Sequence, residues 1–479
     1  MNYRMIAKIL GRVMGLEAVL MLPPLVTALI YKESITCFLL TMLVAAGLSV
    51  VLTLFKPKRS DLYAREGFVS VALSWILMSM VGALPFVFSG EVPSYVDAFF
   101  ETVSGFTTTG ASILVNVEAM SRGLLFWRSL SQWIGGMGVL VFIMAILPLS
   151  ENQSMHIMRA EVPGPMVGKL VPKVRISSAI TYLIYVGLTA LLIILLCLGG
   201  MPIFDSLIHA MSAASTGGYS MRALSVGFYN SAYIDVVTGI FMLLFGVNFS
   251  VYFLLLMKKF RAALTNSELL VYVGIVAFST VTIALDILHL YGTMGNALRY
   301  SFFQVSTVIT TTGFATADFN LWPSYSKWLL VLLMFVGACS GSTGGGIKVS
   351  RIIILLKSAR QETAKLFSPR RTTSVTLDGQ VLDAGTIRST EVFFGLYIII
   401  TFLAVQLVTL DGFDIVTNFT AVVACISNIG PGLGLVSPSG NFAMFSDFSK
   451  VILSFCMLIG RLEVYPLLML VMPSAWRKT

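Results

Sequence analysis

The chain carries little charge. Only 11% of its 479 residues are Asp, Glu, Lys or Arg, whereas 57% are hydrophobic. So little charge excludes an ordinary soluble domain, because the surface of such a domain needs more charged side chains. The composition instead predicts a protein that crosses a membrane many times. The net charge of +9 lies mostly in short segments between apolar runs, so it indicates membrane topology rather than a surface for nucleic acid.

Histidine and cysteine are scarce as well. The sequence has three histidines, which lie far apart, and five cysteines in apolar stretches, without the spacing of a metal site or a disulfide scaffold. We therefore expect the cysteines to be small buried hydrophobic residues. A membrane-embedded enzyme would need His, Asp or Glu gathered at membrane depth, and the sequence shows no such cluster. The chain also needs no bound organic cofactor.

What the chain does contain is a short motif in four versions. Three versions read SGFTTTGAS, ASTGGYS and VITTTGFA, and the last, SNIGPGLG, is the most divergent. The motif returns about every hundred residues, which predicts four copies of one structural unit. The central residues of the motifs form the candidate site: Thr108, Thr109, Gly110, Thr216, Gly217, Gly218, Thr311, Thr312, Gly313, Asn428, Ile429 and Gly430.

Each motif follows a short apolar segment that lies between two segments of spanning length. The short segments are residues 96–106, 203–215, 296–309 and 414–427. A dozen helical residues cover about 18 Å, which is less than the roughly 30 Å of a hydrocarbon core. We therefore expect these segments to enter the membrane and turn back. The motifs would then be extended backbone at membrane depth, which is tolerated only inside protein or along a water-filled path.

Four such turns around one axis would form a ring of backbone carbonyls. Such a ring replaces the water shell of an alkali cation, as in potassium filters. Glycine accepts a positive φ at little cost, so successive carbonyls can face one way, and the short helices direct their negative C-terminal ends at the axis. The fourth motif lacks the threonines and contains Pro431. The ring is therefore imperfect, and the preference for potassium over sodium stays open.

The apolar runs predict an all-α polytopic membrane protein with ten spans and four re-entrant half-helices. Pro23 and Pro24 should kink or break the first span. The expected parts are a two-helix hairpin at residues 1–60, pore repeats at 61–150, 151–262, 263–358 and 391–479, and a basic cytoplasmic loop at 359–390. Of the 32 Lys and Arg residues, 24 lie on the side of the termini and seven on the other. The positive-inside rule therefore places both termini in the cytoplasm and the motifs toward the outside.

A glycine-rich string, CSGSTGGGIK, interrupts the second helix of the third repeat. Each glycine costs about 1 kcal/mol in a helix relative to alanine, so we expect the string to unwind below the filter. It is our candidate gate, and the alternative is close helix packing through small residues. A nucleotide-binding loop is excluded, because Ile347 separates the last glycine from Lys348. The gate residues are Gly341, Ser342, Thr343, Gly344, Gly345 and Gly346.

Arg461 and Glu463 lie in the middle of the last span. A charge at such a position costs about 2.5–3.5 kcal/mol, so Arg461 should face the interior of the bundle. There it could influence the cation, hydrogen-bond the residues 341–346, or make a purely structural contact. Glu463 is an unsuitable partner, because residues two apart on a helix do not face each other.

Several polar residues near the short segments leave two interpretations open. Asp97, Glu101, Asp205 and Asp318 either attract cations to the mouth of the pore or cap helices. His209 lies within the second short segment, where it is either adjacent to the pore or simply packed.

Together with the strings GSTGGGIKVSRI and IGRLEVYPLL, the four motifs resemble the Trk/Ktr/HKT superfamily of potassium transporters, and the N-terminal hairpin resembles its bacterial Trk branch. The resemblance implies four helix–pore–helix units about a pseudo-fourfold axis, potassium as the transported ion, and a homodimer in the bacterial inner membrane. It also implies a cytoplasmic ring of TrkA-like, NAD-binding subunits that gates the pore. It matches Gly110, Gly218, Gly313 and Gly430 to filter glycines, residues 341–346 to the gating loop, and Arg461 to an inner-helix arginine.

These observations predict a gated pore for passive potassium uptake in contact with membrane lipid. The basic stretch 357–388 is the expected docking surface for the regulatory subunit. The alternative is a secondary transporter that couples potassium to protons or sodium. Such a transporter needs a titratable group in the pathway, for which Glu463 and His209 are the candidates.

Overall fold

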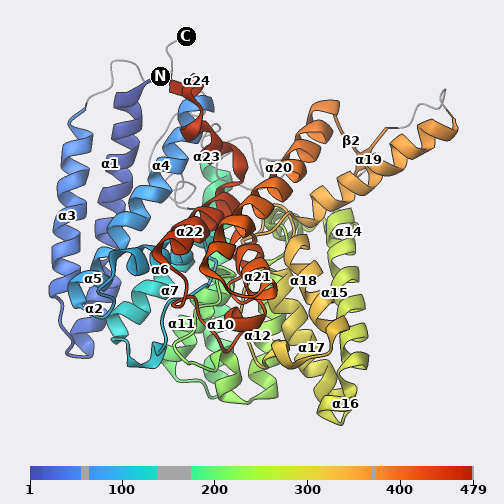
Figure 1. Cartoon of the computed structure of the whole chain (residues 1–479), viewed down its shortest axis with the longest axis horizontal. Helices are drawn as coiled ribbons and strands as arrows, with labels where there is room; N and C mark the ends of the chain where they lie inside the picture. Colours follow the sequence, from blue (N-terminus) through green and yellow to red (C-terminus); the bar gives the residue numbers. More distant parts are fainter. Residues whose placement is uncertain (56–63, 139–173, 369–373, 379, 477–479) are drawn as a thin grey trace.

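The structure is a computed structural model that describes residues 1–55, 64–138, 174–368, 374–378 and 380–476. Helices dominate this part of the chain, and the regular strands in it form one short antiparallel hairpin, β1 Thr376–Leu377 with β2 Gln380–Val381. The expected all-α membrane fold is therefore confirmed. Both termini lie at the same end of the molecule (Figure 1).

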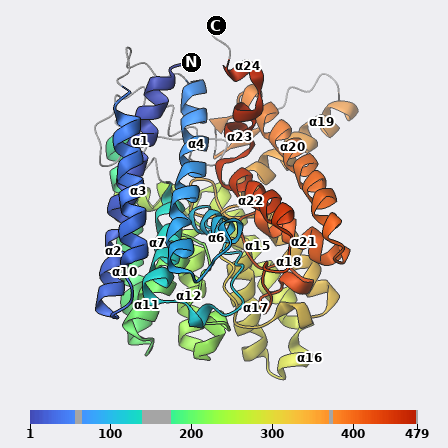
Figure 2. The same ribbon diagram turned by 60° about the vertical axis from the view of Figure 1, so that its left-hand side comes forward.

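The N-terminal hairpin is formed by α1 Tyr3–Leu20, α2 Leu22–Ile30 and α3 Thr36–Thr53. The first span breaks at Met21, directly before the first turn of α2 that holds the two prolines, as predicted. Helix α3 buries only 22% of its apolar window, which suits a helix that faces lipid. Figure 2 shows this hairpin on one side of the molecule and helices α20 to α22 on the other.

The four repeats follow. Each has a first span, a short helix that carries the motif at its end, and a further helical segment after the motif, which we call the inner helix. The first spans are α4 Ala64–Gly82 with α5 Leu84–Ser89, α10 Val174–Leu198, α15 Ser267–Asp286 with α16 Leu288–Tyr291, and α20 Ala384–Val408. The short helices are α6 Tyr95–Phe106, α11 Ile203–Ala214, α17 Met294–Ile309 and α21 Ile415–Ile426. These bounds confirm the four expected short segments.

The inner helices are less regular than the sequence predicts. They are α7 Arg122–Met137, α12 Ala232–Phe245 with α13 Phe249–Leu256, α18 Ser324–Val336 with α19 Val349–Phe367, and α22 Asp447–Leu462 with α23 Val464–Val471. The axes of α12 and α13 meet at 91°. Asn248 ends that bend by accepting a hydrogen bond from the amide of Ser250 at 2.9 Å, which caps α13. The interruptions in the second and fourth repeats were not predicted from the sequence, whereas the one in the third repeat was.

The number of spans follows from these interruptions. Within the described residues, six helices are long and apolar enough to cross a membrane, or seven if α12 and α13 count as one bent span. The count of ten spans is not confirmed, because the broken inner helices are too short by themselves. The chain beyond α7, residues 139–173, which includes the boundary expected between the first and second pore repeats, lies outside the described residues.

The cytoplasmic loop expected at residues 359–390 has regular structure in its described part. Helix α19 continues to Phe367, the β1–β2 hairpin follows, and α20 begins at Ala384. Figure 1 shows α19 projecting away from the helical bundle, at the end of the molecule where the termini lie. Two short helices complete the described chain, α14 Phe260–Leu264 and α24 Pro473–Trp476.

Candidate functional site

The four motifs share one backbone conformation. Each short helix ends with an amide that donates to the carbonyl five residues earlier, which is the hydrogen bond of a Schellman cap. This cap places the residue before the donor in the left-handed region, with φ between 53° and 59°, although none of these residues is glycine. The donor–acceptor pairs are Thr109 with Ser104 at 2.9 Å, Gly217 with Ser212 at 2.9 Å, Thr312 with Thr307 at 2.8 Å, and Ile429 with Ala424 at 2.8 Å.

The glycine that ends each motif also has a left-handed φ, between 74° and 93°. Each glycine touches the backbone of the next repeat, and the contacts run in a closed circle. A methyl group added to each glycine would approach a neighbouring carbonyl oxygen at these distances: Gly110 to Gly217 O 2.2 Å, Gly218 to Thr312 O 1.9 Å, Gly313 to Ile429 O 2.0 Å, and Gly430 to Thr109 O 2.8 Å. The four motifs therefore meet around one axis.

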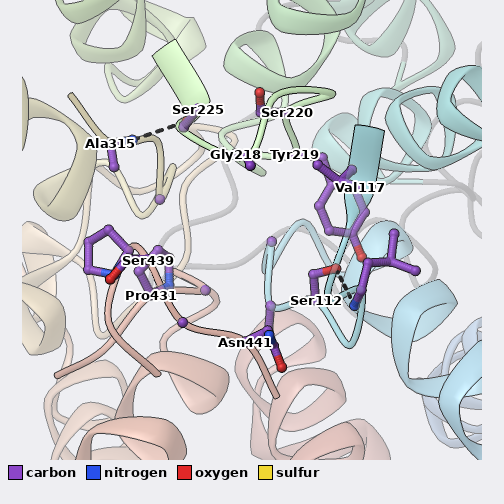
Figure 3. Close-up of a pocket in the computed structure, with 18 of the residues that line it drawn as sticks. Ser112, Val117, Gly218, Tyr219, Ser220, Ser225, Ala315, Pro431, Ser439 and Asn441 are labelled. Atoms are coloured by element: carbon purple, nitrogen blue, oxygen red, sulfur yellow. Dashed lines mark hydrogen bonds between the residues drawn. The ribbon is translucent and has the colours of Figure 1, made fainter. Parts of the chain in front are cut away.

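A pocket of about 170 Å³ lies against this ring, and all four glycines line it. Figure 3 shows segments of all four repeats around it, including Ser112, Tyr219, Ala315 and Pro431. The pocket contains two arginines, Arg128 and Arg222, as well as main-chain and hydroxyl groups. It is a polar vestibule that opens onto the ring.

The carboxylates near the short helices all bind protein groups. Asp97 pairs with Lys450 at 2.5 Å, and Asp205 pairs with Arg222 at 3.3 Å. Asp318 accepts a hydrogen bond from the amide of Asn320 and so caps a short 3-10 turn, as one of the two interpretations expected.

Glu101 is buried and neither caps a helix nor faces the vestibule as a free charge. It forms an ion pair with Arg128 at 2.7 Å and accepts from the amide of Ile113 at 3.0 Å. Arg128 in turn lies 3.9 Å from the ring centre of Tyr219. Glu101 thus fixes the irregular segment that follows the first motif, and its carboxylate compensates the positive charge of Arg128 in the vestibule.

His209 is packed, as the second interpretation expected. Its Nδ1 lies 2.8 Å from the carbonyl of Asp205, and its Nε2 lies 3.0 Å from the hydroxyl of Ser220. The ring also contacts Tyr229 and Phe314. His209 therefore joins the second short helix to the irregular segment beyond its motif, in the same way as Glu101 does in the first repeat.

The glycine-rich string has unwound, as predicted, and residues 337–348 form a loop between α18 and α19. The amide of Gly345 donates to the hydroxyl of Thr311 at 2.6 Å. A methyl group on Gly345 would lie 2.3 Å from the carbonyl oxygen of Ser427, and one on Gly344 would lie 2.9 Å from that of Thr310. The loop therefore touches the third and fourth motifs directly.

The interrupted helix of the second repeat holds the loop from one side. The carbonyl of Gly246 accepts from the amide of Cys339 at 3.0 Å, and the amide of Phe249 donates to Gly341 at 3.1 Å. Glu268, in the first turn of α15, accepts from the amides of Ser340 at 2.7 Å and Ser350 at 3.0 Å. Sequence reasoning missed Glu268, although a lone acidic residue at the start of an apolar span is a usable signal.

Arg461 holds the loop from the other side. It lies in the last turn of α22 rather than in mid-span, because the helix ends at Leu462. Its guanidinium donates to the carbonyl of Thr343 at 2.7 Å, and to those of Gly135 and Gly136 at 2.5 Å each. The expected contact between Arg461 and the loop is therefore present, and it extends to the inner helix of the first repeat.

Glu463 follows the end of α22, with φ at 62°. Its carboxylate accepts two hydrogen bonds from Arg351 at 2.6 and 2.7 Å. Arg351 also stacks on Phe393, 3.9 Å from the ring centre. The sequence excluded Arg461 as the partner of Glu463 but gave no sign of Arg351, which lies at the start of α19 just beyond the loop.

Lys348, at the end of the loop, is buried, and its ammonium donates to the carbonyl of Gly344. No role was predicted for Lys348 from the sequence. Loop residues 341–346 thus have partners from all four repeats: the first and fourth through Arg461, the second through Phe249, and the third through Thr311.

Comparisons with known proteins agree with this architecture. The model of the TrkH family, described as "Cation transport protein", matches residues 34–287 and 269–478. The chain is 37% identical over its whole length to "Trk system potassium uptake protein TrkH" of Salmonella typhimurium, which it also covers completely. It is 34% identical to "Trk system potassium uptake protein TrkG" of Escherichia coli, with 99% of both chains covered. The crystal structure of the potassium transporter TrkH from Vibrio parahaemolyticus superimposes with a TM-score of 0.89 at 32% identity, over all of both chains.

Proposed function

The chain belongs to the TrkH family of cation transport proteins, and from this premise we propose that it takes up potassium through a gated, filter-lined pore. The observation that carries the proposal is the closed circle of contacts between the glycine of each motif and a carbonyl of the next repeat. Carbonyl oxygens around one axis are the ligands that replace the hydration shell of an alkali cation.

The proposed pathway begins in the vestibule. A potassium ion enters from outside, exchanges water for the carbonyls of the four motifs, and continues past the loop into the cytoplasm. The inward-negative membrane potential supplies about 2.3 kcal/mol per charge per 100 mV, so no chemical step is required. The C-terminal ends of the short helices add a favourable negative potential at the ring.

The loop 341–346 together with Arg461 is the proposed gate. The loop contacts the third and fourth motifs from the side away from the vestibule, and Arg461 ties it to the first repeat. The loop is held by individual hydrogen bonds to Phe249, Thr311 and Arg461, which lie on three different segments, so a shift of an inner helix that carries one of these partners would loosen it. Opening would therefore be a displacement of the loop with little change in the ring.

The regulation of this gate is proposed from the context of the relatives. Their names describe a Trk system, which implies further components. We propose a homodimer in the bacterial inner membrane, with both termini in the cytoplasm and a TrkA-like, NAD-binding subunit as the cytoplasmic partner. Helix α19 projects from the bundle at the same end of the molecule as the termini (Figure 1). It carries Lys357, Arg360 and Lys365 and connects directly to the loop. A partner that moves α19 would move the gate.

The alternative of coupling to protons or sodium gains no specific support. Its two candidate titratable groups, His209 and Glu463, make structural hydrogen bonds beside the ring and beyond the loop. Uptake into vesicles driven by a potassium gradient alone, with no dependence on pH, separates a passive pore from a coupled transporter.

The proposed function is tested by placing a side chain in the ring. Serine at Gly313 puts its Cβ 2.0 Å from the carbonyl oxygen of Ile429. We therefore expect Gly313→Ser to lower proteoliposome flux strongly and, in the flux that remains, to change the order of preference among potassium, rubidium, sodium and lithium. The matched control is Gly292→Ser, because Gly292 has a φ of 72° but no atom within 4 Å of an added Cβ. An unchanged order of preference in Gly313→Ser would show that this residue is not in the filter.

A further inference from the structure

The second motif differs from the others at the residue before its glycine. Three motifs have a side chain there, on Thr109, Thr312 and Ile429, whereas the second has Gly217. The hydroxyls of Thr109 and Thr312 are each held by the threonine two residues earlier, at 2.8 and 2.7 Å. The second motif cannot make this contact with its own residues.

Gln132, from the inner helix of the first repeat, fills the vacant position. Its side chain is fully buried, its Nε2 donates to the carbonyl of Gly217 at 2.6 Å, and its Oε1 accepts from the amide of Tyr219 at 3.1 Å. A methyl group on Gly217 would lie 2.5 Å from Cδ of Gln132. A side chain at residue 217 and a glutamine at residue 132 therefore exclude each other.

The carbonyl that Gln132 holds belongs to the ring itself. The oxygen of Gly217 is the atom that a methyl group on Gly110 would meet at 2.2 Å, so it lies at the junction of the first and second motifs. A carbonyl oxygen can accept an amide hydrogen bond and still offer a lone pair to a cation. The bond therefore restrains this carbonyl without removing it from the ring.

We propose that Gln132 is a positioning residue for ion selectivity, whose amide replaces the missing side chain of the second motif and fixes the Gly217 carbonyl in the ring. This inference rests on the proposed function, since it assumes that the ring binds the cation. Selectivity in such a filter depends on the number and field strength of the carbonyls. A glycine peptide without its restraint rotates easily. Loss of Gln132 would therefore leave the Gly217 carbonyl without a fixed position, so that potassium, the larger of the two ions, loses one of its fixed ligands.

The first test removes the amide and keeps the volume. We expect Gln132→Met to lower the ratio of potassium to sodium flux in proteoliposomes by about fivefold to tenfold, as for loss of one hydrogen bond to a restrained group. Gln132→Glu is the second variant, because it can still accept from Tyr219 but, when ionised, cannot donate to Gly217. It should also lower the ratio. The matched control is Gln406→Met on α20, where the side chain is exposed and the ratio should not change.

The second test restores a side chain to the second motif. Gly217→Thr alone should abolish most uptake, because the new Cβ collides with Gln132. Combined with Gln132→Ala, the threonine has room and finds the hydroxyl of Ser215 two residues earlier, as Thr109 finds Thr107. The double variant should therefore recover uptake and a potassium preference above that of Gln132→Ala.

The outcomes separate this inference from the proposed function. If the parent protein shows no preference for potassium in these vesicles, the proposed function fails. If the parent prefers potassium and both Gln132→Met and Gln132→Glu keep the same ratio, Gln132 has no role in selectivity. If the double variant is no better than Gly217→Thr alone, Gln132 does not stand in for a side chain, and the inference is wrong.

Discussion

The two halves of the proposed pathway, an outer half at the motif ring and an inner half at the inner helices and the loop, differ in their symmetry. In the outer half, four short helices end in the same cap, and four motifs have the same two left-handed residues. In the inner half, the helices differ: α7 is followed by Gly138 with φ at 85°, α12 and α13 meet at 91°, a loop separates α18 from α19, and α22 ends before Glu463. The repeats are thus alike where they form the ring and unlike below it.

This difference has a physical reason. A bound cation attracts ligands equally in all directions, so the proposed filter needs equivalent carbonyls from every repeat. A gate needs only one obstruction with a position that can change. A loop from one repeat can be held by single contacts to the other three, and each contact is a place where its position can be biased.

The comparison predicts opposite effects for the same added methyl group in the two halves. Gly218→Ala would place Cβ 1.9 Å from the carbonyl oxygen of Thr312, and the rigid ring cannot move away. We expect a loss of rubidium uptake into proteoliposomes of about a hundredfold or more, given the cost of overfilling a tightly packed site. Gly345→Ala would collide with the carbonyl oxygen of Ser427 at 2.3 Å, and there the loop can retreat. Uptake should then rise.

Gly90→Ala is the control for backbone strain alone, because Gly90 has a φ of 78° and open space around it. Its uptake should equal that of the parent protein. If Gly345→Ala lost uptake as severely as Gly218→Ala, the loop would be as rigid as the ring, and the proposed difference between the two halves would be wrong.

The next largest effect is expected at Arg461. Arg461→Gln loses the charged hydrogen bonds to Thr343, Gly135 and Gly136, so the loop loses its tie to the first repeat. A hydrogen bond to a charged group contributes about 1.5–3 kcal/mol, which predicts a rise in uptake of at least about tenfold without any regulatory subunit. Arg461→Lys keeps the charge and some donors, so its rise should be smaller. Equal uptake in all three proteins would mean that Arg461 does not restrain the gate.

The sequence predicts the parts that depend on local signals. The four short helices were predicted from the length of their apolar runs, and the unwound loop around residues 341–346 from consecutive glycines. The contact of Arg461 with the loop was predicted as one of several possibilities, because a lone charge in an apolar span needs a polar partner. The sequence does not identify all the partners of Arg461, because one of them, Gly135, lies 326 residues away.

The parts that were missed depend on contacts between distant residues. Nothing near Thr108 or Asn428 indicates a left-handed backbone, because the cap and the ring impose it together. Gly217 looks like an ordinary variation of the motif until Gln132 is seen beside it, 85 residues away. The break after Leu462 and the pairing of Glu463 with Arg351 are of the same kind. Such pairs are visible in a single sequence only as unexplained polar residues.

The smallest expected effect concerns the outer ends of the short helices, where the repeats differ in chemistry. Asp414 caps α21 and Ser94 caps α6, each by accepting from the amide three residues on. The side chain and amide of Thr417 hold the pKa of Asp414 below its ordinary value. Asp414→Ala and Ser94→Ala should each cost about 1 kcal/mol of stability at pH 7, the usual value of a helix cap.

Only the carboxylate cap should depend on pH. A group with a lowered pKa in the folded protein contributes stability above its unfolded pKa, and the contribution disappears as the pH falls through the folded value. In thermal unfolding of the detergent-solubilised protein, the stability deficit of Asp414→Ala relative to the parent protein should therefore shrink as the pH falls from 5 to about 3, near and below the ordinary aspartate pKa. The deficit of Ser94→Ala should stay constant. If both deficits shrink together, the loss at low pH belongs to the outer half as a whole and not to the cap of the fourth repeat.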